Sequence, residues 1–148
     1  MLKEVQNHQL SSHSVIRDVL PTASIKGCVF HFTKAVWWKT QELGLKTTYS
    51  QRGAEYRYIR MLMALPFLPA HDIEPAFQLL SDRATSPELR SLVRYLENTW
   101  MDNAVWRPRN WSIYRHSIRT NNDVEGMYYF KKCYFNDIMQ TLLFLLFL

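Results

Sequence analysis

The chain has 148 residues, which is enough for about one domain and excludes two independently folded ones. Hydrophobic residues make up 47% of it and aromatic residues 14%, which excludes a disordered tail, because so apolar a chain can bury enough surface to offset its ordering entropy. The net charge of +5 is compatible with a polyanionic partner. The two cysteines, Cys28 and Cys133, are too few for a disulfide scaffold and indicate free thiols in a reducing compartment.

The N-terminal third predicts one strand followed by one helix. No apolar stretch follows Lys3, so the first residues do not resemble a signal peptide, and we expect an intracellular protein. Residues 25–30 are short, mostly apolar and β-prone, which predicts a strand buried on both faces. From Phe32 to Leu43 the spacing of apolar residues becomes helical, and Gly44 follows as a residue able to take positive φ after the helix.

Three more helices are predicted by apolar residues at helical spacing between residues 56 and 100. The first ends at Leu65-Pro66, the second is capped by Asp72, and the third begins with Ser86 as its N-cap and Pro87 at its first position. We interpret their apolar stripes as core rather than as partner-binding faces. The stripes consist of Tyr56, Ile59, Leu62 and Met63, then Ile73, Ala76, Phe77 and Leu80, then Leu89, Leu92, Val93, Leu96 and Trp100.

Residues 101–118 break the helical period and predict a loop, which contains the densest basic patch of the chain. Between Val105 and Thr120 four arginines occur without an acidic residue, and aromatic residues lie between them; the arginines are Arg107, Arg109, Arg115 and Arg119. Guanidinium groups match phosphate oxygens and aromatic faces stack on unpaired bases, so the pattern favours nucleic-acid contact. The alternative is that Trp106 and Trp111 pin the loop to the core while the arginines are simply solvated.

Two polar clusters are candidates for a chemical site. Cys28 and His31 lie three residues apart, but four ligands are needed for structural zinc, and the predicted burial of Cys28 argues against a reactive thiol. Residues 119–126 can open a helix with an Asn or Asp cap. The functional alternative is that Glu125 is one carboxylate of a divalent-metal site.

The C-terminal residues 138–148 carry no charge and are too few to span a membrane. Three interpretations fit such a run: a buried terminal segment, a patch that touches a membrane, or non-native sequence from a truncated or misread frame. We favour the last of these. We expect no stable membrane insertion.

Two motifs together resemble the transposase domain of Mutator-like elements (MULE). They are Gly27-Cys28-x-Phe30-His31-Phe32 and, after a helical stretch, Arg119-Thr120-Asn121-Asn122-x-Val124-Glu125-Gly126. The segment between them, with its Glu42-Leu43-Gly44-Leu45, is similar to the helical insertion of that family. The resemblance covers roughly residues 15–126.

This resemblance implies an RNase H-like fold in which two aspartates and one glutamate hold Mg²⁺ or Mn²⁺ for DNA cleavage and strand transfer. Glu125 matches the third carboxylate, and Cys28 with His31 match a Cys-x-x-His signature. The first aspartate has no counterpart, and an ungapped count places the amides Asn7 and Gln9 at the second acidic motif. An amide lends an oxygen to a metal but no charge, so we expect that Glu125 alone holds no metal ion.

We therefore expect a mainly α-helical chain with one or a few short strands, which forms an incomplete RNase H-like α/β catalytic core carrying a helical insertion. The partial transposase-like domain spans residues 1–126 with the insertion at about 45–105, and residues 127–148 form a divergent apolar tail. The expected function is a nuclear, catalytically inactive fragment of a DNA transposase, with DNA as its partner and no small-molecule substrate. The alternatives are a non-catalytic DNA-binding module that uses the four arginines, and a helical protein-interaction remnant.

Overall fold

A computed structural model of the chain describes residues 29–102 and 107–115. Helices account for 78% of these residues, and no strand occurs among them, so the chain is mainly α-helical. In chain order the elements are α2 (Val29–Glu42), α3 (Lys46–Ser50), α4 (Ala54–Ala64), the 3₁₀ turn η1 (Leu65–Phe67), α5 (Ala70–Asp82), α6 (Pro87–Leu96), the π-helical turn η2 (Glu97–Met101) and α7 (Pro108–Trp111).

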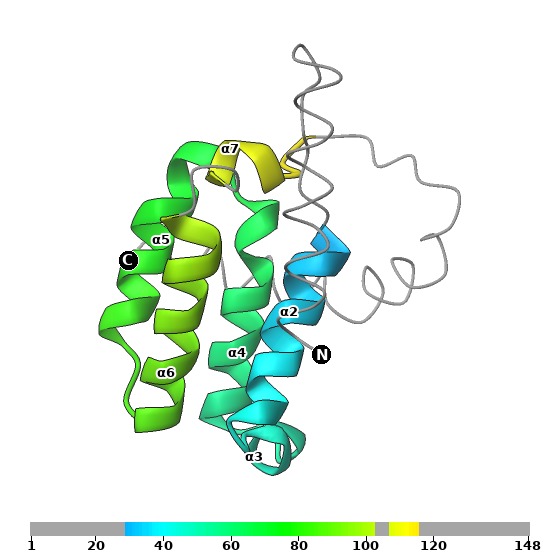
Figure 1. Ribbon diagram of the computed structural model, residues 1–148, viewed down its shortest axis with the longest axis vertical. Coiled ribbons are helices and arrows are strands. Elements are labelled where there is room, and N and C mark those ends of the chain that lie inside the picture. The colour runs from blue at the N-terminus through cyan, green and yellow to red at the C-terminus, as the bar shows by residue number, and fades with distance from the viewer. Residues whose placement is uncertain (1–28, 103–106, 116–148) are drawn as a thin grey trace.

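The four longer helices, α2, α4, α5 and α6, run alternately up and down in a bundle (Figure 1). Helix α2 contacts both α4 and α6, and α4 contacts α5. The short α3 lies at one end of the bundle and α7 lies at the other (Figure 1). Short connections favour this antiparallel arrangement, because each helix must turn back beside its predecessor to bury its apolar face.

Local sequence fixes two of the helix ends. The side chain of Ser86 accepts a hydrogen bond from the backbone N–H of Leu89 at 3.1 Å, so Ser86 is the predicted N-cap of α6. Helix α2 is followed by Gly44 at φ +78°, where the N–H of Gly44 donates to the carbonyl of Gln41 and the N–H of Leu45 donates to that of Thr40. This pair of bonds satisfies carbonyls at the end of the helix and requires a residue that tolerates positive φ.

The predicted apolar stripes form the core. All the stripe residues of α5 and α6 are buried, and so are Ile59, Leu62 and Met63 of the stripe on α4. The fourth predicted residue of that stripe, Tyr56, is only half-buried, and Tyr58 is buried in the core instead. Fully burying one such side chain contributes roughly 1.5–3 kcal/mol, so the stripes supply most of the free energy that holds the helices together. Among the described residues, no helix is long and apolar enough to cross a membrane.

Three expectations about secondary structure were wrong. The predicted strand at residues 25–30 is contradicted at Val29 and Phe30, which form the first turn of α2. Val29 is buried on the same side of the helix as Phe32 and Val36, so the helical spacing begins earlier than predicted. Asp72 lies inside the first turn of α5, whose N-cap is Pro69. The loop predicted at 101–118 contains the end of η2 and all of α7, because tertiary contacts order a segment without helical spacing.

Candidate nucleic-acid interface

The basic segment between Arg107 and Arg115 is built around Trp111, which is 0% exposed. Its indole stacks on Phe32 of α2, with ring centroids 4.9 Å apart and an interplanar angle of 14°, and meets Trp100 edge-on at 6.2 Å. Trp111 therefore pins α7 to the bundle and is not available to stack on a base. Trp106 lies outside the described residues.

Two hydrogen bonds fix the backbone that follows α7. The Ser112 hydroxyl donates to the carbonyl oxygen of Leu68 at 2.7 Å, and the backbone N–H of Ile113 donates to the carbonyl oxygen of Pro66 at 2.7 Å. Both acceptors belong to the turn between α4 and α5. The segment is thus held by a buried ring and by the backbone of the helix connection beneath it.

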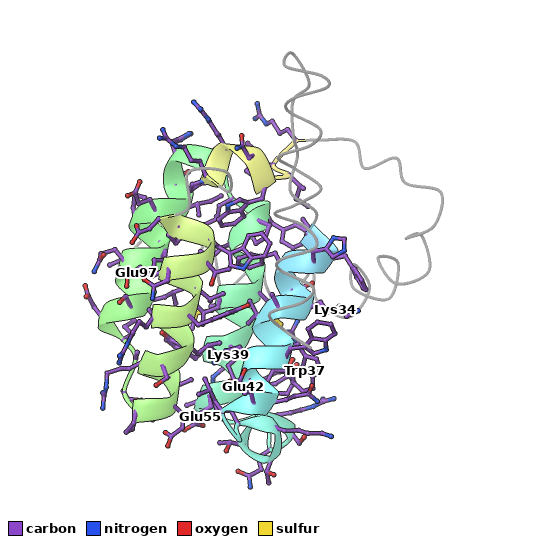
Figure 2. All side chains as sticks on the ribbon, viewed as in Figure 1. Lys34, Trp37, Lys39, Glu42, Glu55 and Glu97 are labelled. Carbon is purple, nitrogen blue, oxygen red and sulfur yellow. The ribbon has the colours of Figure 1, made fainter. Side chains whose placement is uncertain are left out.

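The three described arginines of the patch, Arg107, Arg109 and Arg115, are all exposed on this anchored segment. Arg107 is the N-cap residue of α7, Arg109 lies inside the helix, and Arg115 follows it at φ +57° with its guanidinium 5.3 Å from the ring centroid of Tyr114. None of the three forms an ion pair within the described residues. Side chains ending in nitrogen project outward around α7 (Figure 2).

This arrangement places positive charge at one end of the bundle. No acidic residue lies between Arg107 and Arg115, so no carboxylate of this segment would repel a phosphate there. The ring of Tyr114 is 42% exposed and remains accessible to a base or a sugar. The chemistry offered is therefore non-covalent contact with a polyanion through forked, charge-assisted hydrogen bonds.

The residues that carry the family resemblance are only partly within the described chain. His31 is exposed on the first turn of α2, with its ring edge-on to Phe30 at 5.9 Å. Cys28, Arg119, Thr120, Asn121, Asn122 and Glu125 lie outside the described residues. Where the structure is described, no three of His, Cys, Asp and Glu lie close enough together to hold a metal ion.

The sequence analysis missed an aromatic and basic row on α2. We call Phe30, Lys34 and Trp38 the α2 stripe; these residues lie at i, i+4 and i+8, so they share one face of the helix. The Lys34 ammonium is 5.6 Å from the ring centroid of Phe30 and 4.5 Å from that of Trp38. The spacing is visible in the sequence, but the predicted strand ends at Phe30, and a residue in that strand does not share a helix face with Lys34 and Trp38.

No protein-family model, no curated protein and no solved structure matches the chain. The burial of Trp111 agrees with the alternative in which this ring pins the loop to the core, and Arg107, Arg109 and Arg115 are exposed on the backbone that this packing fixes.

Proposed function

We propose that the chain is a catalytically inactive remnant of a MULE-type transposase that binds DNA through Arg107, Arg109 and Arg115. The observation that supports binding is the exposure, on a segment anchored by Trp111, of three guanidinium groups that form no ion pair with another described residue. Because the backbone beneath them is already ordered, little conformational entropy is lost when a phosphate binds. Contacts of this kind hold the DNA backbone and read no sequence directly.

The proposed ancestry is supported by where the helical body lies in the chain. Three of the four bundle helices, α4, α5 and α6, fall within residues 45–105, the region in which the resemblance implies a helical insertion, whereas α2 precedes that region. An RNase H-like core belongs to the proposal as the part of the ancestor that carried its chemistry. Its third carboxylate would be Glu125, which lies outside the described residues, as do Asn7 and Gln9.

DNA binding is tested by a double substitution of exposed arginines. We expect Arg107→Gln/Arg109→Gln to weaken binding to duplex DNA and to reduce the slope of log affinity against log salt by about 1.8, since each lost phosphate contact contributes about 0.9. The measurement is fluorescence anisotropy of a labelled duplex over a salt series. The matched control is Arg83→Gln/Arg94→Gln, which removes an exposed arginine just after α5 and another within α6. Equal slopes for the two variants would contradict the proposed surface.

The absence of catalysis is a separate prediction. A site with Glu125 as its single carboxylate and amides at Asn7 and Gln9 has too little negative charge to hold two divalent ions. We therefore expect the purified chain to leave supercoiled plasmid intact in the presence of Mg²⁺ or Mn²⁺. Nicking that disappears in the Glu125→Gln variant would show that the chain is an active enzyme, while the binding result above would stand unchanged.

A further inference from the structure

Charge is divided unequally between the two halves of the bundle. Residues 29–64, which form α2, α3 and α4, contain six Lys and Arg residues and two Glu residues, whereas residues 70–102, which form α5, α6 and η2, contain three Arg residues and six Asp and Glu residues. The first half is therefore basic and the second acidic. A polyanion approaching the bundle is attracted to the α2 side and repelled from the α5–α6 side.

The α2 stripe lies on this basic half. Phe30 is 45% exposed, Trp38 is half-buried, and the exposed Lys34 extends between their rings. Figure 2 shows Lys34 and Trp37 on the edge of α2 away from Lys39 and Glu42, so this edge is not occupied by the ion pair that Lys39 and Glu42 form at 2.9 Å.

Half-buried rings continue the aromatic surface from α2 onto α3 and α4. Trp37 contacts Tyr49 with ring centroids 4.9 Å apart, and Tyr49 contacts Tyr56 at 4.8 Å. On α4, Arg60 donates a hydrogen bond to the Tyr56 hydroxyl at 2.6 Å and lies over the same ring. Rings braced in this way lose little freedom when a flat ligand stacks beside them.

We propose that the α2 stripe binds single-stranded DNA, with unpaired bases stacking on Phe30 and Trp38 and a phosphate contacting Lys34. The inference rests on the proposed function for the choice of DNA, and it adds a second surface and a second class of substrate to it. Alternation of aromatic faces with positive charge is the pattern by which proteins hold unpaired nucleotides without sequence preference. A duplex hides its base faces by stacking, so it cannot use Phe30 and Trp38 in this way.

The test is the affinity of the full chain for a labelled oligothymidylate, measured by fluorescence anisotropy. We expect Phe30→Leu/Trp38→Leu to weaken this binding about tenfold, because leucine keeps apolar bulk but cannot stack on a base. The matched control is Leu79→Ala, which truncates a side chain that is also 45% exposed but lies on α5 in the acidic half. Circular dichroism at increasing temperature verifies that the variants remain folded.

The outcomes separate this inference from the proposed function. The inference is supported if Phe30→Leu/Trp38→Leu loses oligothymidylate binding but keeps duplex binding. This result would support the α2 stripe even if duplex binding did not depend on Arg107 and Arg109. Unchanged oligothymidylate affinity in a folded Phe30→Leu/Trp38→Leu variant overturns the inference while leaving the duplex surface intact. Tighter binding to oligouridylate than to oligothymidylate would overturn the assignment of DNA as the ligand.

Discussion

At the scale of single residues, two aromatic side chains three positions apart have opposite roles. Trp111 is fully buried against Phe32 and Trp100, while Tyr114 is largely exposed beside Arg115. Sequence reasoning placed both in one basic and aromatic patch and left their roles open. The distinction depends on ring partners that are distant in the chain, so no local pattern could reveal it.

Among the described residues, Tyr58 is the one whose protonation is most strongly affected by the fold. Its side chain is buried on α4, and its hydroxyl donates a hydrogen bond to the carbonyl oxygen of Leu80 on α5 at 2.7 Å. Burial raises the pKa of Tyr58 well above its ordinary value of 10.0, because the phenolate would lose its hydration. A raised pKa in the folded state means that this residue stabilises the fold fully below pH 10 and progressively less as pH rises above that value.

We predict that Tyr58→Phe lowers the free energy of unfolding by about 1 kcal/mol at pH 7, because it removes one buried hydrogen bond. The loss is no larger because the Leu80 carbonyl still accepts a hydrogen bond from the N–H of Arg83. At pH 10.5 the difference from wild type should shrink by about 0.8 kcal/mol, because only the wild-type unfolded state gains a phenolate at this position. Urea unfolding at both pH values measures the change. The control Tyr114→Phe removes an exposed hydroxyl and should show neither effect; a Tyr58→Phe difference that is constant with pH would contradict the argument.

At the scale of elements, the long helices were predictable and the short ones were not. The apolar spacing at residues 56–63, 73–80 and 89–96 predicted α4, α5 and α6, and Ser86 and Gly44 marked helix ends because each makes a local hydrogen-bonding or conformational contribution. Helices α3 and α7 have five and four residues, too few for a period to show. The strand expected up to Phe30 failed because a short apolar run does not distinguish a strand from a buried helical turn.

Of the two candidate surfaces, one was predictable from the sequence and the other was not. The arginines of α7 could be chosen from the sequence, because charge without acidic neighbours is visible there. The α2 stripe was missed, because Phe30 lines up with Lys34 and Trp38 only when the helix begins before residue 30. The mispredicted strand at residues 25–30 was therefore enough to obscure the alignment of Phe30, Lys34 and Trp38 on one helix face.

At the scale of the whole molecule, Trp111 closes one end of the bundle. Its ring contacts residues of α2 and η2, and the backbone beside it is bonded to the connection between α4 and α5. A single side chain therefore joins elements from most of the described chain. The same contacts position the arginines, so stability and DNA binding are coupled at this end.

We predict that Trp111→Ala lowers the free energy of unfolding by about 3–5 kcal/mol, the usual cost of removing a large buried aromatic side chain. Because α7 would lose its anchor, binding to duplex DNA should weaken as well. Urea unfolding and anisotropy measure the two effects. Leu79→Ala serves as the exposed control, with an expected change within about 0.5 kcal/mol. A cost for Trp111→Ala below about 1 kcal/mol would show that the end of the bundle closes without it.

The closure by α7 also has a consequence for the order in which the chain folds. Contacts between α2 and α4 and between α4 and α5 join neighbouring segments, so they close short loops and can form early. The bond from Ser112 to Leu68 spans 44 residues, and the stacking of Trp111 on Phe32 spans still more of the chain, so both require helices that are already in place. We expect these contacts to be absent from the folding transition state, which makes α7 the last element to dock and the rate of its release a determinant of how long the native state survives.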